Sequence, residues 1–159
     1  MEVASITIRE AQAHEFEKVG QLRRAEGEDA MQGSIQRTKV KFAEISQQKR
    51  VCLFAEVEGN VVGSVQVQFY IPVKQLADGK DIAHADDLYV AYAYRSRGIG
   101  KRLMRALENT AREYGFLKLT LGVRHGDSYG FLTHWYRSLG YRYWQEKEDG
   151  TATLFIKEL

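Results

Sequence analysis

The first third of the chain alternates between apolar and polar residues in a way that predicts one strand followed by two helices. Residues 4–9 alternate apolar and polar side chains, as a half-buried strand does. Residues 16–22 place apolar side chains at helical spacing, and a weaker apolar cluster at 40–45 indicates a second short helix. Between these helices, residues 25–33 are mostly polar and contain glycine, so we interpret them as a loop.

The middle of the chain predicts a hairpin and a third strand. Residues 50–57 and 61–69 are rich in β-forming side chains and are separated by a Glu-Gly-Asn turn at 58–60. Glycine and asparagine accept positive φ, which favours a tight hairpin. Residues 71–81 are expected to form a loop, and 84–90 another strand.

The last third alternates helices and strands. An apolar stripe from Ile99 to Tyr114 predicts a helix that Gly115 ends, and a second stripe from Leu132 to Leu139 predicts another that Gly140 ends. Asp127 or Ser128 could cap this second helix. Three more strands are expected, at residues 116–123, 141–146 and 151–157.

These elements give the order β-α-α-β-β-β-α-β-α-β-β. Antiparallel hairpins precede β-α-β units, which predicts an α/β (α+β) fold with a mixed sheet and helices on both faces. A length of 159 residues without internal repeats or a Pro-rich linker fits a single domain over residues 1–159.

Composition excludes several classes of function. The net charge of +2 gives no global field for nucleic acid or membranes, so we expect neither as a partner. Cys52 is the only cysteine, which excludes an internal disulfide and a multi-thiolate metal site, and we expect no metal. The first residues lack a signal-peptide pattern and no apolar run could span a bilayer, so we expect a cytoplasmic protein.

A glycine-rich turn, Arg95-Ser96-Arg97-Gly98-Ile99-Gly100, joins a predicted strand to a predicted helix. Its glycines let backbone N–H groups point inward, and the helix adds free N–H donors with a positive dipole, so the turn suits a pyrophosphate. A Walker loop would need Ser or Thr where Arg102 stands, and a dinucleotide fold would need a glycine where Leu103 stands.

This turn and its flanks resemble the acetyl-CoA signature of the GNAT superfamily of N-acetyltransferases. The core pattern is Arg or Gln, two residues, Gly, one residue, then Gly or Ala. Two more segments are similar to the family, Val61-Val62-Gly63 and Trp135-Tyr136-Arg137-Ser138-Leu139-Gly140-Tyr141. Two positions depart from the family pattern. Tyr92 stands where the family often has a proline, and Tyr129 stands at about the position where the family often has an asparagine that binds the cofactor.

The resemblance implies a splayed sheet that binds acetyl-CoA as cosubstrate. The pantetheine arm would bond to the backbone of Leu88 and Val90, and the pyrophosphate to the amides of residues 97–100. The residues expected to bind the cofactor are Leu88, Tyr89, Val90, Arg95, Ser96, Arg97, Gly98, Ile99, Gly100 and Lys101. The acceptor would be a primary amine of a small molecule or peptide that attacks the thioester directly, without a covalent enzyme intermediate.

The attacking amine must lose a proton, and the resemblance implies a base at His84 or Asp86. Strand alternation would place both on one face with Leu88 and Val90. Proton transfer from a lysine-like ammonium is uphill by about 6.5 pKa units to aspartate and about 4 to histidine. His84 is therefore the better final acceptor, with Asp86 as orienter or ammonium binder, and a water chain stays an alternative.

The same resemblance gives Tyr136 the role of supporting the departing thiolate. The acidic residues 26–29 hint at a cationic acceptor, such as a polyamine or aminoglycoside. Two other functions remain open, an acyl-CoA sensor without turnover and an ATP-binding domain. A homodimer also remains open.

Overall fold

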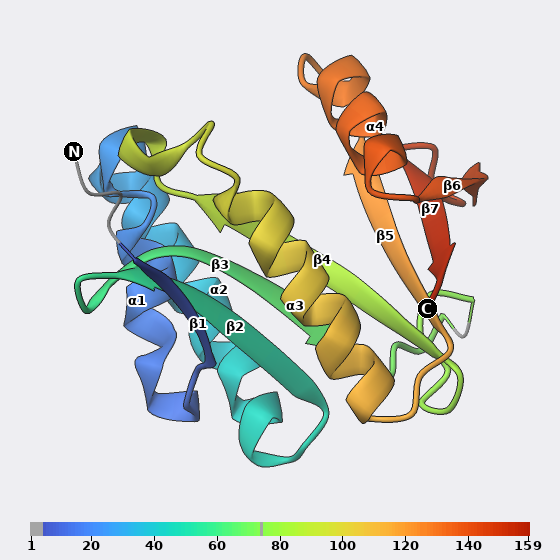
Figure 1. Ribbon diagram of the computed structural model, residues 1–159, viewed down its shortest axis with the longest axis horizontal. Coiled ribbons are helices and arrows are strands. Elements are labelled where there is room, and N and C mark those ends of the chain that lie inside the picture. The colour runs from blue at the N-terminus through green and yellow to red at the C-terminus, as the bar shows by residue number, and fades with distance from the viewer. Residues whose placement is uncertain (1–4, 74) are drawn as a thin grey trace. The chain divides into compact units, whose positions relative to one another are not determined.

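The computed structural model describes residues 5–73 and 75–159, and its elements follow the predicted order (Figure 1). The strands are β1 (Ile6–Glu10), β2 (Arg50–Val57), β3 (Asn60–Gln68), β4 (Ile82–Val90), β5 (Lys118–Arg124), β6 (Arg142–Glu146) and β7 (Ala152–Glu158). The α-helices are α1 (Phe16–Gln21), α2 (Glu28–Ser46), α3 (Ile99–Glu113) and α4 (Tyr129–Ser138). Short 3-10 helices are η1 (Ala13–Glu15), η2 (Arg24–Glu26) and η3 (Tyr92–Tyr94). Among the residues described, none of the helices is both long and apolar enough to cross a bilayer.

The seven strands form one mixed sheet in the order β1-β2-β3-β4-β5-β7-β6. The β1–β2, β5–β7 and β6–β7 pairs are antiparallel, whereas β4 and β5 are parallel. The parallel ladder runs from the pair Ile82–Lys118 to the pair His84–Thr120, whereas the ladder between β5 and β7 runs the full length of β5. This short ladder fits the predicted splayed, mixed sheet.

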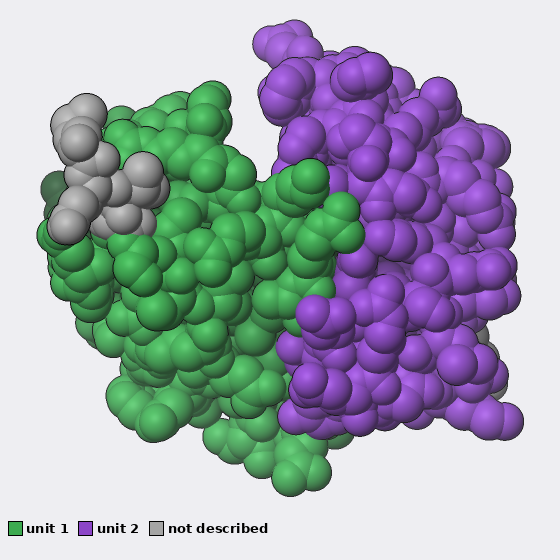
Figure 2. Space-filling model, in the orientation of Figure 1, with its two compact units in different colours: residues 1–67, 87–107 green, residues 68–86, 108–159 purple. Residues whose placement is uncertain are grey.

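The chain forms two compact units (Figure 2). The first comprises residues up to 67 together with 87–107, and the second comprises 68–86 together with 108–159. Strands β3 and β4 and helix α3 each contribute residues to both units. That residues 1–159 form a single domain stays a prediction.

In the first unit, helices lie on both faces of the strands. Buried Phe42 of α2 packs in a cluster with Cys52 and Phe54 of β2. On the other face, Gly63 of β3 lies against α3, where an added Cβ would come within 3.1 Å of Leu103 Cδ1. Cys52 is thus a buried core residue, as its place in a predicted strand indicated.

Helices α1 and α2 approach each other closely at Gly20. A Cβ at this position would lie 2.2 Å from Ile35 Cγ1 and 2.9 Å from the Met31 carbonyl oxygen. Since no side chain fits there, glycine allows the backbone of α1 to pack directly on α2.

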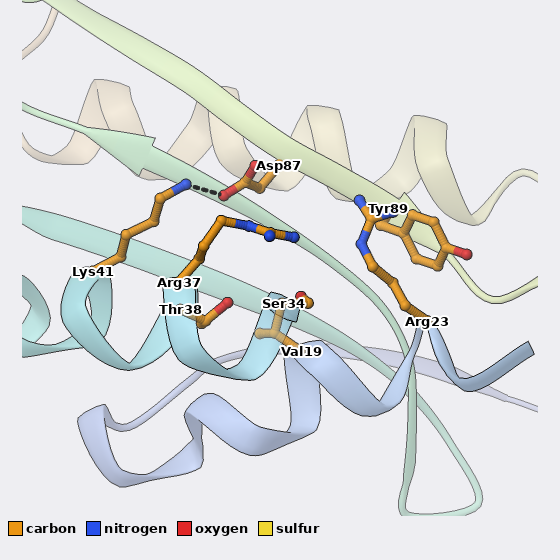
Figure 3. A pocket seen from close by; sticks show the side chains of 8 residues that line it. All are labelled: Val19, Arg23, Ser34, Arg37, Thr38, Lys41, Asp87 and Tyr89. Carbon is orange, nitrogen blue, oxygen red and sulfur yellow. Dashed lines mark hydrogen bonds and ion pairs between the residues drawn. The ribbon is translucent and has the colours of Figure 1, made fainter. Parts of the chain in front are cut away.

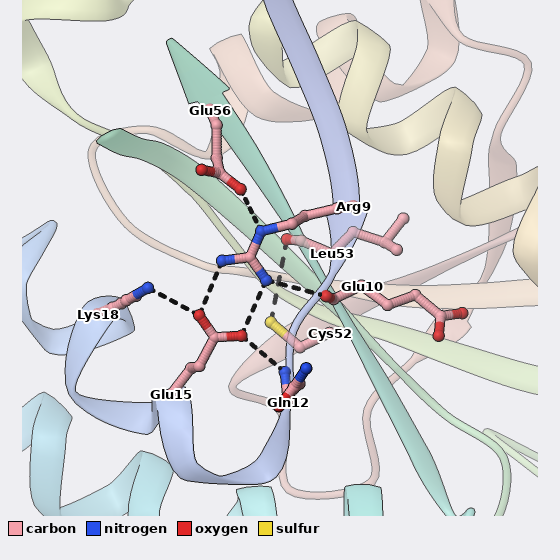
Figure 4. Close-up of polar contacts among 8 residues, drawn as sticks. All are labelled: Arg9, Glu10, Gln12, Glu15, Lys18, Cys52, Leu53 and Glu56. Atoms are coloured by element: carbon pink, nitrogen blue, oxygen red, sulfur yellow. Dashed lines mark hydrogen bonds and ion pairs between the residues drawn. The ribbon is translucent and has the colours of Figure 1, made fainter. Parts of the chain in front are cut away.

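Ion pairs of Arg9 connect strand β1 to Glu15 of η1 and to Glu56 of β2 (Figure 4). The Arg9 guanidinium of β1 donates to both carboxylate oxygens of Glu15, at 2.8 and 2.7 Å, and also to Glu56 of β2. Glu15 further accepts from Lys18 Nζ and from the Gln12 backbone N–H. The Arg9 guanidinium therefore holds the pKa of the buried Glu15 carboxyl well below its usual range, against the opposing effect of burial.

Helix α2 differs most from the prediction. It begins at Glu28, inside the stretch 25–33 that was expected to be a loop, and runs to Ser46. Its buried residues are Ser34, Thr38 and Phe42, spaced one turn apart. Because two of these three are polar, the buried stripe has no apolar period that the sequence could reveal.

Turns and helix ends match the prediction in position but not always in detail. The hairpin between β2 and β3 has positive φ at Glu58 and Gly59, whereas the expected Asn60 already belongs to β3. Helices α3 and α4 end before Gly115 and Gly140, both with positive φ, as predicted. The N-cap of α4 is Ser128, but its side chain makes no capping hydrogen bond.

Some predicted boundaries shift by two residues or fall outside the described residues. Strand β4 begins at Ile82, earlier than expected, and β5 begins at Lys118, later than expected. Ala4, predicted to begin the first strand, and Lys74, in the predicted loop 71–81, lie outside the described residues.

Candidate functional site

The glycine-rich turn begins the α3 helix with an exposed, open backbone. Ser96 and Gly98 both have positive φ, at 61° and 79°. A Cβ at Gly98 would meet no atom within 4 Å, and the Gly98 carbonyl accepts from the Arg102 N–H at 3.1 Å. The turn is therefore open at Gly98, and the first amides of α3, which have no acceptor within the helix, lie at the positive end of the helix dipole, an arrangement that suits a phosphate group.

The basic side chains around the turn stack on tyrosines or bind backbone. Arg95 donates from Nε to the Val90 carbonyl at 2.8 Å, and its guanidinium lies 3.9 Å from the Tyr92 ring centroid and 5.1 Å from that of Tyr89. The Arg97 guanidinium lies 5.3 Å from the Tyr94 ring. The predicted residues Arg95, Tyr89 and Val90 are thus in direct contact, while Lys101 lies exposed at the helix start.

Strand β4 contains a left-handed residue that changes the predicted arrangement of its side chains. Asp87 has φ 54°, so strict alternation does not continue through it. Gln66 and Gln68 lie two residues apart on β3, and their amides donate to Asp87 (3.4 Å) and Asp86 (2.7 Å) respectively. Since Gln66 and Gln68 share a face of β3, Asp86 and Asp87 also share one. Alternation predicted that Leu88 would lie on the same face of β4 as Asp86. In the structure it lies on the opposite face.

His84 is held in a defined orientation by Thr120 of β5. His84 Nδ1 lies 2.8 Å from Thr120 Oγ1, and that hydroxyl lies 2.6 Å from the Leu76 carbonyl oxygen. A hydroxyl has one proton, and the carbonyl can only accept it, so Nδ1 carries a proton and donates to Thr120. In neutral His84 the lone pair is then on Nε2, the form a proton acceptor needs.

Tyr136 lies in an aromatic environment on α4. Its ring makes edge contacts with Trp135 and Tyr141, at centroid distances of 4.9 and 5.9 Å. Burial raises the pKa of the Tyr136 phenol to about 12. Within residues 5–73 and 75–159, its hydroxyl makes no intramolecular hydrogen bond, so a ligand could use it as a donor.

A polar cavity of about 50 Å³ lies between α2 and β4 in the first unit (Figure 3). The side chains that line it are Val19, Arg23, Ser34, Arg37, Thr38, Lys41, Asp87 and Tyr89. Lys41 Nζ lies 2.7 Å from Asp87 Oδ2, and the Arg23 guanidinium lies 4.2 Å from the Tyr89 ring centroid. Of these residues, only Tyr89 was a site candidate from the sequence, and then for the cofactor.

The acidic residues of the stretch 26–29 interact with other parts of the protein, through side-chain contacts of Glu26 and through the first turn of α2. Glu26 accepts from the Tyr89 hydroxyl at 2.8 Å and pairs with Arg23 at 3.2 Å. Burial and this hydrogen bond raise the pKa of Tyr89 to about 12. Glu28 and Asp29 lie in the first turn of α2, where negative charge stabilises the helix.

The cavity residues on α2 were missed because the sequence did not reveal that this helix begins at Glu28. Successive cavity residues of α2 are three or four positions apart, which places them on one side of the helix: Ser34, Arg37, Thr38 and Lys41. This spacing has meaning only once α2 is known to begin at Glu28.

In the described residues, no group of three or more His, Cys, Asp or Glu side chains could hold a metal ion.

Comparisons with known proteins agree with this geometry. Several solved structures resemble the chain over nearly its whole length, at identities that establish the fold alone. The PaiA N-acetyltransferase from Thermoplasma acidophilum, in complex with coenzyme A, has 19% identity and a TM-score of 0.75, covering 98% of this chain and 99% of that one. A GNAT-family acetyltransferase from Streptococcus pneumoniae has 20% identity and a TM-score of 0.73, with the same coverage.

An aminoglycoside 6'-N-acetyltransferase complexed with coenzyme A has 16% identity and a TM-score of 0.65, covering 96% of each chain. No curated protein sequence matches the chain. The family model described as "Acetyltransferase (GNAT) family" matches residues 16–141, which include α1 to α4 and the glycine-rich turn. The chain therefore belongs to the GNAT acetyltransferase family.

Proposed function

We propose that the protein transfers an acetyl group from acetyl-CoA to the primary amine of a small molecule or peptide. The observation that carries this proposal is the open turn 95–100 at the start of α3, joined by Arg95 to the end of β4. A turn that served only to connect two elements would not need exposed amides, an unobstructed glycine and flanking cations together.

In this proposal, the turn and β4 hold the cosubstrate. The amides of residues 97–100 bind the pyrophosphate, with Lys101 and Arg97 adding positive charge. The backbone of Leu88 and Val90 bonds to the pantetheine arm as a neighbouring strand would. The Val90 carbonyl already accepts from Arg95, so Arg95 would position the strand end as well as attract the phosphates.

The reaction proceeds by direct attack. The neutral amine nitrogen forms a bond to the thioester carbon, the C–S bond breaks, and its electron pair leaves with the thiolate of CoA. The amine proton passes to His84 Nε2, directly or through water, with Asp86 orienting the relay. The Tyr136 hydroxyl donates a hydrogen bond to the departing thiolate, and no acyl-enzyme forms.

An acetyl-transfer screen tests this function. Polyamines, aminoglycosides, amino acids and peptide N-termini are incubated with acetyl-CoA, and release of the free thiol is followed. We expect thiol release that depends on both the amine and the enzyme. A melting temperature raised by acetyl-CoA without turnover on any amine would indicate an acyl-CoA sensor instead. A shift with Mg-ATP but not with acetyl-CoA would refute the cosubstrate assignment.

A further inference from the structure

The cavity between α2 and β4 has more positive than negative charge. Two of its three cations have a carboxylate partner, since Lys41 pairs with Asp87 and Arg23 pairs with Glu26. The third, Arg37, forms no ion pair with any residue of the part of the chain that the structure describes. Arg37 therefore leaves a net charge of about +1 and a set of hydrogen-bond donors for a ligand.

Arg37 is an exposed residue of α2 whose side chain lines this cavity. Figure 3 shows its side chain extending from α2 along β4, toward the space between Asp87 and Tyr89. One turn earlier on α2, Gly33 leaves room for the guanidinium, because a Cβ there would lie 3.2 Å from Arg37 Nη1. An alanine at position 33 would require the guanidinium to shift by a few tenths of an ångström.

Two hydroxyl groups complete the polar lining. Ser34 and Thr38 are buried residues of α2 that line the same cavity. Neither hydroxyl forms a hydrogen bond with another residue in the described ranges, so both are available to a ligand. Together, Arg37, Ser34 and Thr38 present donors to a small volume, and donors in this arrangement suit an anion.

We propose that this cavity binds the carboxylate of the acceptor, so that the substrate is an amine bearing a carboxylate, such as an amino acid. The inference rests on the proposed acetyl transfer and names the substrate class. The guanidinium of Arg37 donates two parallel hydrogen bonds to the carboxylate, and the hydroxyls of Ser34 and Thr38 add to them. A volume of about 50 Å³ suits one small group rather than a sugar ring.

The cavity lies beside the part of β4 that is assigned to the pantetheine arm of the cosubstrate. Asp87 and Tyr89 line the cavity, and they flank Leu88, whose backbone is assigned to the pantetheine arm. A molecule with its carboxylate at Arg37 would therefore present its amine beside the same strand. By contrast, a polycation would meet three cations there, while Asp87 and Glu26 are already paired.

The test compares each of the twenty amino acids with its carboxamide as acceptor. The two acceptors differ in charge at the carboxyl end. The carboxamide also has the less basic amine, so at a given pH a larger fraction of its amine is in the reactive neutral form. In the wild-type enzyme, we expect kcat/KM to be at least about tenfold higher for the preferred carboxylate than for its carboxamide. Equal values, or a preference for the carboxamide, would overturn the inference and leave acetyl transfer intact.

Arg37→Gln assigns the effect to this cavity. We expect the variant to lower kcat/KM about tenfold for the carboxylate and to lower it much less for the carboxamide, which carries no charge at that end. Arg105→Gln is the matched control, because Arg105 is exposed on α3 and does not line the cavity. This variant should leave kcat/KM for both substrates at the wild-type value. A thermal melt verifies that both variants fold. An undiminished carboxylate preference in folded Arg37→Gln would contradict the assignment.

A binding experiment separates this inference from the proposed function. Amino acids are titrated by calorimetry into the protein saturated with CoA, which requires no turnover. Binding that Arg37→Gln weakens about tenfold would support the carboxylate site even if acetyl transfer failed. No binding of any amino acid would overturn it, whatever the acetyl-transfer screen shows.

Discussion

The role of Tyr136 can be tested by Tyr136→Phe, which removes one hydroxyl and keeps the ring. The edge contacts with Trp135 and Tyr141 involve the ring alone, so packing should survive. In the described residues the hydroxyl makes no intramolecular hydrogen bond, so its removal should leave the melting temperature unchanged or slightly raised.

The expected loss of kcat depends on whether Tyr136 donates a full proton or only a hydrogen bond, and its raised pKa distinguishes the two. With the Tyr136 pKa near 12 and a thiol near 8.5, full proton transfer to the thiolate is uphill by about 3.5 units, or roughly 5 kcal/mol. Tyr136 should therefore act as a hydrogen-bond donor rather than a full proton donor. A hydrogen bond to a charged group contributes about 1.5–3 kcal/mol, which corresponds to a loss of roughly 10- to 150-fold in kcat.

The assay measures thiol release under saturating acetyl-CoA and amine, with calorimetry for acetyl-CoA affinity. Because the phenol stays protonated below about pH 11, the pH–rate profiles of wild type and variant should be parallel up to pH 10. Tyr143→Phe is the control, since Tyr143 is 50% exposed on β6. Wild-type kcat in folded Tyr136→Phe would reduce Tyr136 to a packing residue.

Three further outcomes are expected. Gly98→Asn should weaken acetyl-CoA binding at least about tenfold in calorimetry, because asparagine tolerates the φ of 79° but places a side chain at the phosphate site; Gly150→Asn, at φ 75°, should lose similar stability without losing affinity. If His84 accepts the amine proton, kcat/KM should rise with pH in two steps, the lower one for His84 and the higher one for the amine itself; His84→Gln should remove the lower step, and high pH should restore much of the rate, whereas an unchanged profile would exclude His84 as the base. Glu15→Gln should lower the free energy of unfolding in urea by about 2 kcal/mol at pH 7. Since the folded-state pKa of Glu15 is depressed, its stabilisation is complete above the ordinary pKa of about 4.3 and is lost as pH falls below it, so a pH-independent difference would contradict this origin.

The sequence predicted the element order and the glycine-rich turn between β4 and α3 because both depend on local patterns. Glycine at positions 98, 115 and 140 indicates positive φ through its own chemistry, and each of the three has it in the structure. The apolar stripe of α3 is strong enough to define that helix without any knowledge of its neighbours.

The cavity could not be predicted because it depends on contacts between distant segments. Thr38 and Ser34 are buried without being apolar, so they give no sign of the long helix that carries Arg37. That Arg37 forms no ion pair within residues 5–73 and 75–159 can be seen only once the partners of Arg23 and Lys41 are known. Such pairings depend on tertiary geometry, which a single sequence does not encode in any short pattern.

The left-handed conformation of Asp87 has a consequence for changing the specificity of this enzyme. Every residue of β4 after Asp87 is offset by one position relative to ordinary alternation. A β-branched residue at position 87 would favour ordinary strand geometry, and Leu88 would then exchange faces with Tyr89. One dihedral angle thus sets which side chains of β4 face the proposed acceptor site, so substitutions along β4 that aim at new acceptors should retain aspartate, asparagine or glycine at position 87.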